Sequence, residues 1–282
     1  MSVPSNIRRR AWRSAAIAAT LLAAAVLAPS LAAAATGATT VQGPKPTIVL
    51  VHGAWADSSS WSGVVRRLQN DGYVVDAPPN PLRGLPYDAS YLANFISTIS
   101  GPMVLVGHSY GGAVITNAAT GNPNVKALVF VDAFAPAAGE SIGQLAAAQP
   151  GSVLASDPAT VFNFVPYPGG PPGDVDLYLK PDVFAQSFAG DLPAKQSLML
   201  SAEQRPLAAS AAAEPSGSPA WLTIPSWYVI GTADRVLPAT EQEFMATRAH
   251  SHVTRVDASH LAMVSHPDLV EGVIRDAANA TS

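Results

Sequence analysis

The fold is decided by the ten-residue stretch Met103-Val104-Leu105-Val106-Gly107-His108-Ser109-Tyr110-Gly111-Gly112. Its first four residues form an unbroken apolar run, which is typical of a parallel strand buried on both faces. The run leads directly into a Gly-x-Ser-x-Gly pattern, and residues 113–119 can form a helix. The stretch therefore predicts a strand, a sharp turn that carries Ser109, and a helix.

Ser109 has the setting of a nucleophile. Gly107 and Gly111 lack side chains, so backbone segments can approach closely on either side of the turn. The start of the following helix adds free amides and a dipole, which favour developing negative charge. Because the five-residue pattern also arises by chance, a glycine-rich loop with an incidental serine is the alternative interpretation.

Strand and helix patterns alternate on either side of this stretch. Short apolar or β-branched runs predict strands at residues 47–51, 73–75, 127–131, 226–230 and 253–256. Apolar residues at helical spacing lie between these runs, and Ser265 with Asp268 predicts a capping box at the start of the last helix. The alternation predicts an α/β fold with a mostly parallel sheet flanked by helices.

The alternation breaks between about residues 134 and 219. This segment is rich in Ala, Pro and Gly and shows no evident strand run. We predict that it forms an inserted helical cap within a single domain at residues 36–282. Its aromatic residues either line a pocket or form the core of the cap, and large apolar side chains are more often buried.

The first 35 residues predict a secretory signal peptide. Four arginines precede an apolar run at residues 15–28, and small residues follow at 31–35. The run is short for a transmembrane helix, which needs about 20 apolar residues. We therefore expect an exported protein, secreted or periplasmic, with an uncleaved anchor as the alternative. The paired Arg9 and Arg10 leave the general secretory and the twin-arginine routes both open.

The remaining 247 residues suffice for one domain with a sizeable core. They contain twelve basic and twenty acidic side chains, a net charge of −8 that makes nucleic acid an unfavourable partner. The sequence has no cysteine, which excludes disulfides, thiolate nucleophiles and cysteine-bound metals. The spacing of histidines and carboxylates does not indicate a metal site either.

A serine hydroxyl needs a base, and His260 is the best placed of the six histidines. It follows the predicted strand at 253–256, in a loop at the carboxyl end of the sheet. The imidazole in turn needs a carboxylate, and Asp234, just past the strand at 226–230, gives the chain order Ser, Asp, His. Asp132, at the end of an earlier strand, is the rival acid.

Acyl transfer also needs two backbone amides that bind the oxyanion. The residue after the nucleophile, Tyr110, provides one of them, and the loop after the first strand provides the other. That loop reads His52-Gly53-Ala54-Trp55, so we assign the second amide to Ala54. We expect the side chains of His52 and Trp55 to serve local packing.

Together these segments resemble the α/β-hydrolase superfamily, and most of all its small esterase group related to plant methyl esterases and hydroxynitrile lyases. The resemblance covers the mature chain outside the insertion. It implies a cofactor-free hydrolase with a cap over the site and the same triad of Ser109, Asp234 and His260. Lyases of that group have a lysine after the catalytic histidine, whereas Leu261 stands here, so cyanohydrin cleavage is disfavoured.

We therefore predict a carboxylic ester hydrolase that acts on a small-molecule ester and, once its signal peptide is cleaved, is not stably inserted in a membrane. A lactonase, thioesterase or amidase would use the same triad. A cofactor-free haloperoxidase or a ligand-binding protein on the same fold are further alternatives. The sequence does not give the natural substrate, the physiological role or the oligomeric state.

Overall fold

The computed structural model describes residues 45–281, so the predicted signal peptide at residues 1–35 lies outside the described residues. Residues 45–281 belong to one compact unit. Within this range, no helix combines the length and the apolar character that a bilayer crossing requires.

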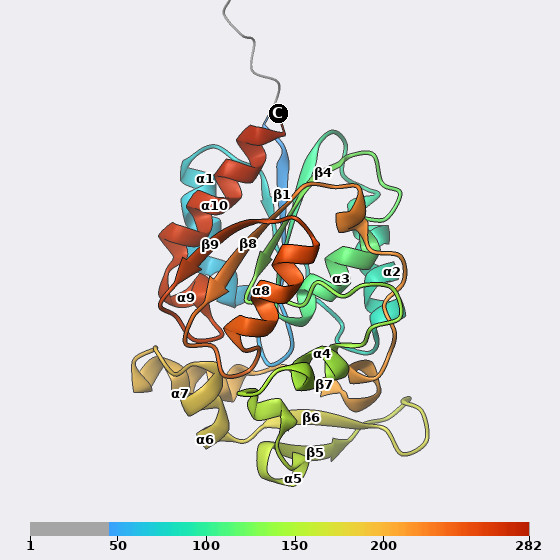
Figure 1. Ribbon diagram of the computed structural model, residues 1–282, viewed down its shortest axis with the longest axis vertical. Helices are drawn as coiled ribbons and strands as arrows, with labels where there is room; N and C mark the ends of the chain where they lie inside the picture. Colours follow the sequence, from blue (N-terminus) through green and yellow to red (C-terminus); the bar gives the residue numbers. More distant parts are fainter. Residues whose placement is uncertain (1–44, 282) are drawn as a thin grey trace, which may run out of the picture. The chain divides into compact units, whose positions relative to one another are not determined.

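A six-stranded parallel sheet forms the centre of this unit (Figure 1). Its strands, in spatial order, are β2 (Val75–Asp76), β1 (Thr47–Val51), β3 (Met103–His108), β4 (Val125–Val131), β8 (Ser226–Gly231) and β9 (His252–Val256). Each neighbouring pair is parallel, as predicted. The edge strand β2 is shorter than predicted and begins later, because Val74 is exposed and contributes no buried run.

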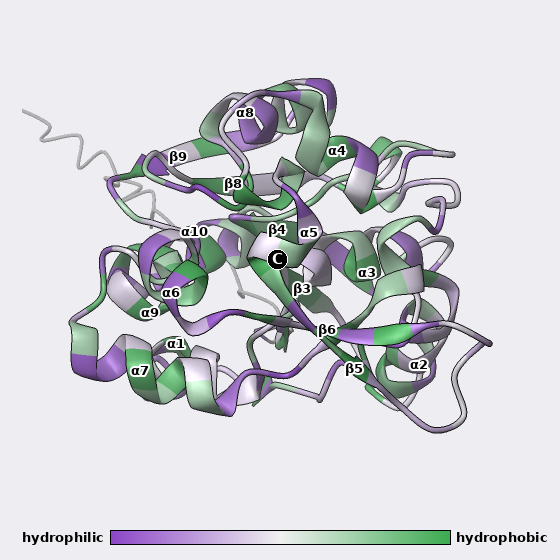
Figure 2. Cartoon of the chain, turned by 90° about the horizontal axis from the view of Figure 1, so that it is seen from below, coloured by the Kyte–Doolittle hydropathy of each residue, from purple (hydrophilic) through white to green (hydrophobic). Residues whose placement is uncertain are grey.

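Helices cover both faces of the sheet, which explains why its inner strands are mainly apolar. Every residue of β3 and of β8 is buried. On one face, α1 (Ser62–Asn70) packs against α10 (Pro267–Ala280), and on the other face α2 (Leu85–Ile96) packs against α3 (Tyr110–Ala118) (Figure 2). A strand between two helical layers meets apolar side chains on both sides, so a continuous hydrophobic run is the expected pattern.

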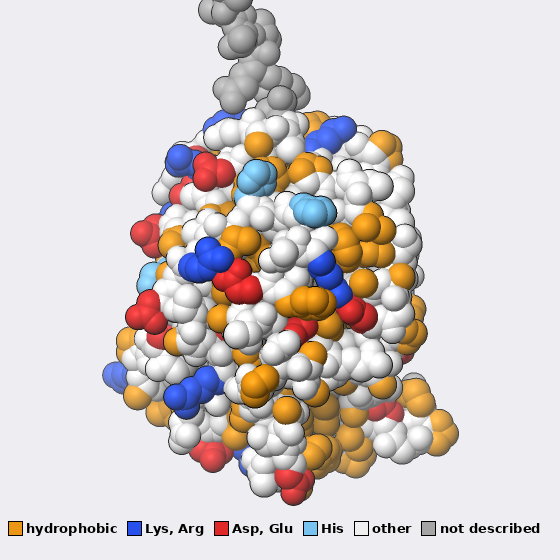
Figure 3. Space-filling model, viewed as in Figure 1, with side chains coloured by type: hydrophobic (Ala, Val, Ile, Leu, Met, Phe, Trp, Pro, Cys, Tyr) orange, Lys and Arg blue, Asp and Glu red, His pale blue; other side chains and the backbone are white. Residues whose placement is uncertain are grey.

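The segment between β4 and β8, which contains the predicted insertion, lies at the carboxyl ends of the strands (Figure 1). We call it the cap. Its helices are α4 (Ile142–Ala148), α5 (Pro158–Val161), α6 (Pro181–Val183) and α7 (Ala194–Glu203). Hydrophobic side chains gather over the lower part of the face shown in Figure 3, where the cap lies. Leu198 and Met199, both on α7, are more than half exposed.

The cap also contains a small antiparallel sheet that the sequence analysis missed. Its strands are β5 (Phe162–Pro166), β6 (Val175–Leu179) and β7 (Leu207–Ala208), in that spatial order. Four of the five residues of β5 are exposed. Asn163 and Pro166 interrupt the apolar residues of this strand, and the Pro- and Gly-rich loop at residues 167–173 concealed the hairpin.

The predicted capping box at the last helix is wrong. The N-cap of α10 is His266, without a side-chain hydrogen bond, while Ser265 ends the short helix α9 (Ala262–Ser265). The hydroxyl of Ser265 instead pairs with Nδ1 of His266 at 2.9 Å. The preceding helix ends directly before α10, so Ser265 is helical and cannot take the extended conformation that an N-cap requires. Pro267 does occupy the first turn, as predicted.

Candidate active site

Ser109 lies on the turn between β3 and α3, and its backbone is strained. Its φ is 51° and its ψ is −124°. A β-carbon on Gly107 would lie 2.6 Å from the carbonyl oxygen of Gly111, and one on Gly111 would collide with the carbonyl of Val51. The two glycines are therefore required by the close approach of backbone segments, and the turn holds the Ser109 hydroxyl at the carboxyl edge of the sheet.

The structure brings His260 to this serine. His260 lies in the loop between β9 and α9 and is fully buried. Its Nε2 lies 2.8 Å from Oγ of Ser109, although 151 residues separate the two in sequence. This distance is that of a hydrogen bond through which the hydroxyl can pass its proton to the imidazole.

Asp234 lies behind the imidazole. Its Oδ2 is 2.7 Å from Nδ1 of His260. The backbone amides of Val236 and Leu237 donate to the other oxygen, Oδ1, at 2.7 and 3.0 Å. Gln242, on α8 (Ala239–Arg248), donates to Oδ2 at 2.9 Å. The carboxylate is thus fixed by three groups besides the histidine, which holds the ring in one orientation.

The rival acid, Asp132, does not bond the imidazole. Its Oδ1 accepts from the amide of Gly231 at 2.8 Å, and its Oδ2 accepts from the amide of Ala262 at 3.0 Å. The side chain is fully buried. The geometry therefore pairs His260 with Asp234, as the preferred sequence interpretation expected, and gives Asp132 backbone partners instead.

Burial governs the electrostatics of the pair. It lowers the pKa of His260 below its ordinary value of 6.5, so the ring is neutral near pH 7. Burial raises the pKa of Asp234, while the amides of Leu237 and Val236 act in the opposite direction. The single ring proton lies on Nδ1, where Asp234 accepts it. This tautomer leaves Nε2 free to accept the proton of Ser109.

The amides of Ala54 and Tyr110 border the same cavity as Ser109. Within residues 45–281, neither amide donates a hydrogen bond to the protein. Tyr110 is the first residue of α3, where helical amides lack an acceptor inside the helix. Trp55, next to Ala54, has a φ of 57° and donates its own amide to the carbonyl of Arg205 at 2.8 Å. Two free donors beside a serine suit an oxyanion site.

The cavity beside Ser109 has a volume of about 110 Å³ and is lined almost entirely by apolar groups. The sheet and its loops provide Ala54, Trp55, Ser109 and Tyr110, and the cap provides the rest: Phe134, Ile142, Gly143, Ala146, Leu154, Phe162, Leu177, Leu207 and Ala212. Among the described residues, no Asp, Glu, Lys or Arg borders the cavity. The hydroxyl of Tyr110 donates to buried Asp88 at 2.8 Å. The cavity therefore offers an uncharged apolar group a place next to the hydroxyl of Ser109.

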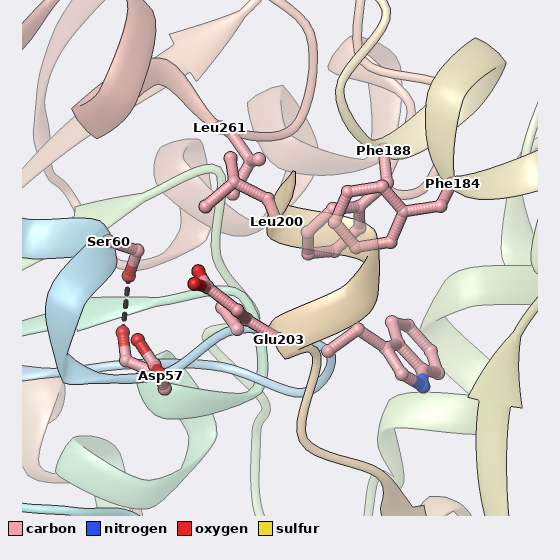
Figure 4. A pocket seen from close by; sticks show the side chains of 9 residues that line it. Asp57, Ser60, Phe184, Phe188, Leu200, Glu203 and Leu261 are labelled. Atoms are coloured by element: carbon pink, nitrogen blue, oxygen red, sulfur yellow. Dashed lines mark hydrogen bonds between the residues drawn. The ribbon is translucent and has the colours of Figure 1, made fainter. Parts of the chain in front are cut away.

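A second, narrower pocket is shown from close by in Figure 4, and Trp55 lines both pockets. Phe184, Phe188 and Leu200 from the cap and Leu261, the neighbour of His260, form its apolar wall. The ring of Phe188 lies 5.1 Å from the ring of His260. Asp57 and Glu203 border this pocket on its polar side.

Comparison with known proteins places this arrangement in a family. The profile described as "Alpha/beta hydrolase family" matches residues 48–273, well over half of the chain. The chain belongs to this family. The match begins at β1 and ends within α10, so it includes the turn of Ser109 and the loops of Asp234 and His260.

Individual members of the α/β-hydrolase family agree with this assignment. The chain is 30% identical over 261 residues to alpha/beta hydrolase nvfD of Aspergillus novofumigatus, covering 83% of this chain and 97% of that protein. It is 29% identical over 254 residues to a pyrethroid hydrolase of Sphingobium wenxiniae, covering 83% and 88%.

A solved esterase structure has a similar fold. The structure of polyneuridine aldehyde esterase superposes with a TM-score of 0.71 and 20% identity, covering 83% of this chain and 99% of that one. At this level of identity the likeness concerns the fold.

One feature of the site, Gln242, was not foreseen, whereas the burial of His52 was. Sequence reasoning missed Gln242, because a glutamine in the second turn of a surface helix gives no signal of its partner eight residues earlier. His52 is buried as expected, with the amide of Asn80 donating to its Nε2 at 2.9 Å and its Nδ1 facing the carbonyl of Gly53 at 2.9 Å. Within the described range, no three His, Asp or Glu side chains are grouped as metal ligands.

Proposed function

We propose that this α/β-hydrolase cleaves carboxylic ester bonds, with Ser109 as nucleophile, His260 as base and Asp234 as acid. The observation that carries the proposal is the continuous path from Ser109 Oγ to His260, at 2.8 Å, and from His260 to Asp234, at 2.7 Å. The relative named a pyrethroid hydrolase supports hydrolytic chemistry on a small organic molecule. A serine activated in this way attacks acyl carbons.

In the proposed reaction, Ser109 Oγ attacks the ester carbonyl as its proton passes to Nε2 of His260. The carbonyl oxygen becomes an oxyanion, to which the amides of Ala54 and Tyr110 donate. Collapse of this intermediate breaks the bond to the alcohol, which leaves with the proton from His260. Water then enters and attacks the acyl carbon as it loses a proton to His260. The bond from the acyl carbon to Ser109 Oγ breaks, the acid leaves, and His260 returns the proton to Oγ. Asp234 stabilises the imidazolium that forms in each half-reaction.

The two pockets suggest how the ester lies. The alcohol takes its proton from His260, so it departs on the side of Leu261 and the narrow pocket. The acyl group then occupies the 110 Å³ cavity, which borders the two oxyanion amides. A dry cavity of roughly 150 Å³ holds one benzene molecule. We therefore expect an uncharged acyl group of no more than about six carbon atoms.

Turnover of p-nitrophenyl butyrate tests the proposal. We expect Ser109→Ala to lower turnover by roughly a thousandfold or more, since the nucleophile is lost. The control is Ser226→Ala, which removes a buried serine hydroxyl from the start of β8, where it pairs with Ser251. Retained turnover in Ser109→Ala would contradict the assignment. Binding of an ester without hydrolysis by the unaltered protein would favour a ligand-binding role instead.

A panel of lactones, thioesters and amides separates the remaining alternatives, because all of them would use Ser109. Ester hydrolysis at a higher kcat/KM than any of the three is the expected result. We also propose export, on the basis of the arginines and apolar run before residue 36. Recovery of the full-length protein inside the producing cell would contradict that second proposal.

A further inference from the structure

His108 and Asp132 are fully buried, and the proposed reaction does not use either side chain. They lie at the ends of two neighbouring central strands. His108 ends β3, directly before Ser109, and Asp132 follows β4. Both reach across to the same loop, which joins β9 to α9 and carries His260. The pair is informative because a buried polar group has to find its partners within the protein.

His108 bonds the backbone of the base itself. Its Nε2 lies 2.8 Å from the carbonyl oxygen of His260, 152 residues away in sequence. A carbonyl only accepts hydrogen bonds, so Nε2 carries the ring proton and donates it. Nδ1, which is then unprotonated, has no hydrogen-bond partner within residues 45–281. The ring therefore makes one polar contact in the described structure, and that contact holds the loop.

Asp132 joins the loops of the acid and of the base. It accepts from the amide of Gly231, three residues before Asp234, and from the amide of Ala262, two residues after His260. Its φ of 46° is left-handed, a conformation that Asn and Asp adopt more readily than most residues. The strained backbone thus places one carboxylate between two loops whose spacing sets the Asp234 to His260 distance.

We propose that His108 and Asp132 are positioning residues, which together fix the His260 loop so that Nε2 stays within hydrogen-bond reach of Ser109. The inference rests on the proposed function, because it assigns the two residues to the reaction of the triad. A displacement of the base by about 1 Å is enough to lower the rate roughly a hundredfold. Neither residue borders the cavity beside Ser109, so substrate binding does not depend on them.

Paired substitutions of His108 test the first half of the proposal. His108→Met removes the donor, and we expect kcat to fall about 10- to 100-fold with KM changed less than about twofold. His108→Gln keeps an N–H at the position of Nε2 and should restore kcat to within about fivefold of the unaltered protein. The control is Thr116→Val, which removes a buried hydroxyl of α3 that has no partner within the described residues.

The contrast between the two variants excludes a merely structural role. If His108→Met and His108→Gln lower kcat equally, or if the loss lies in KM, the donor does not position the base. Melting temperatures are measured in parallel, and kcat is compared well below the lowest of them. An unaltered kcat in His108→Met would overturn the proposal.

Amide hydrogen exchange tests the second half without reference to activity. Asparagine also tolerates the left-handed backbone, so Asp132→Asn does not strain the turn. Its side chain has one acceptor oxygen, whereas the amides of Gly231 and Ala262 each need an acceptor. We expect exchange at Ala262 or Gly231 to become roughly tenfold faster and kcat to fall about tenfold. Asp76→Asn, at the end of the edge strand β2, is the matched control. Unchanged exchange at both amides would overturn the role of Asp132.

The two proposals fail in different ways. If the unaltered protein hydrolyses no ester and its Ser109 resists fluorophosphonates, the proposed function fails, whatever the exchange rates show. If the unaltered protein is active and His108→Met is equally active, only the positioning role fails.

Discussion

The sheet and the cap contribute to the site in different ways. The sheet and its loops provide Ser109, Asp234 and His260, each in the segment that follows the carboxyl end of a parallel strand. The strands β3 and β8 are buried, whereas β9 is an edge strand with two exposed residues. The cap provides nine of the residues around the cavity and none of these three. The carboxyl ends of parallel strands lie at a common edge of the sheet, which brings the three side chains together. The cap has only to fill and shape space.

This division teaches that reactivity and selectivity are separable in this chain. Substitutions in the sheet loops should change the rate for every substrate by a similar factor. Substitutions in the cap should change which substrate is preferred, while the chemical step itself persists. The following predictions are ordered from the largest expected effect to the smallest, and each either breaks this distinction or makes it sharper.

The largest effect is expected at the acid. Asp234→Asn keeps the shape of the side chain but favours the wrong tautomer of His260, and we expect kcat to fall roughly 10³- to 10⁴-fold. The loss should be similar for short and long acyl groups, because Asp234 does not border the cavity. Steady-state kinetics on acetyl, butanoyl and hexanoyl nitrophenyl esters give the measurement. If kcat falls no further in Asp234→Asn than in Asp132→Asn, Asp132 again becomes a candidate for the acid.

A smaller and selective effect is expected in the cap. Ala146 on α4 lines the cavity and is buried, so Ala146→Leu reduces the space for the acyl group. We expect kcat/KM for a hexanoyl ester to fall at least about tenfold and that for an acetyl ester to change less than about threefold. Ala147→Leu, on the exposed side of the same helix, is the control. An equal loss for both esters would show that the cap also controls the chemical step.

The smallest effect concerns the free energy of unfolding and involves His52, in the loop after β1. Burial lowers the pKa of His52 to about 4, with Arg205 acting in the same direction. Since the unfolded chain binds this proton near pH 6.5, the contribution of His52 to the free energy of unfolding is present above pH 6.5. It is lost as the pH falls toward 4, by up to about 1.4 kcal/mol per pH unit.

Urea unfolding of His52→Gln isolates this contribution. The difference in unfolding free energy between the unaltered protein and the variant should narrow steadily from pH 7 to pH 5. Asn94→Gln, which replaces an exposed side chain of α2 that carries no titratable group, should give a difference that does not vary with pH. A His52→Gln difference that is also constant would show that His52 titrates at an ordinary pH in the folded state.

Much of the sheet was predictable because the signals for its strands lie within short stretches of the sequence. A strand between two helical layers is apolar at most positions, and the Gly-x-Ser-x-Gly turn carries its own steric signature at Gly107 and Gly111. The cap strand β5 has no such signature, because four of its residues are solvated. It pairs with β6 through a hairpin whose loop, at residues 167–173, is rich in Pro and Gly. Taken alone, such a loop predicts an interruption of regular structure.

The chain order Ser, Asp, His proposed three residues for the site, and the structure brings Ser109, His260 and Asp234 within hydrogen-bond distance of one another in series. Their connections were harder to predict, because spacing alone did not separate Asp234 from Asp132. The choice between the two carboxylates depends on hydrogen bonds that only the folded chain makes. Asp132 accepts from the amides of Gly231 and Ala262, which lie 99 and 130 residues away in sequence. The hydrogen bonds from Gln242 to Asp234 and from His108 to the backbone of His260 also form only in the folded structure. Such contacts produce no periodic pattern of residues in a sequence.

The central claim is that the hydroxyl of Ser109 is made nucleophilic by His260. Its most direct test is mass spectrometry of the protein after treatment with a fluorophosphonate, followed by peptide mapping. The account predicts one adduct per chain, located on Ser109, and a labelling rate that falls by orders of magnitude in His260→Ala. An adduct on a different serine, or labelling of Ser109 at an undiminished rate in His260→Ala, would contradict it.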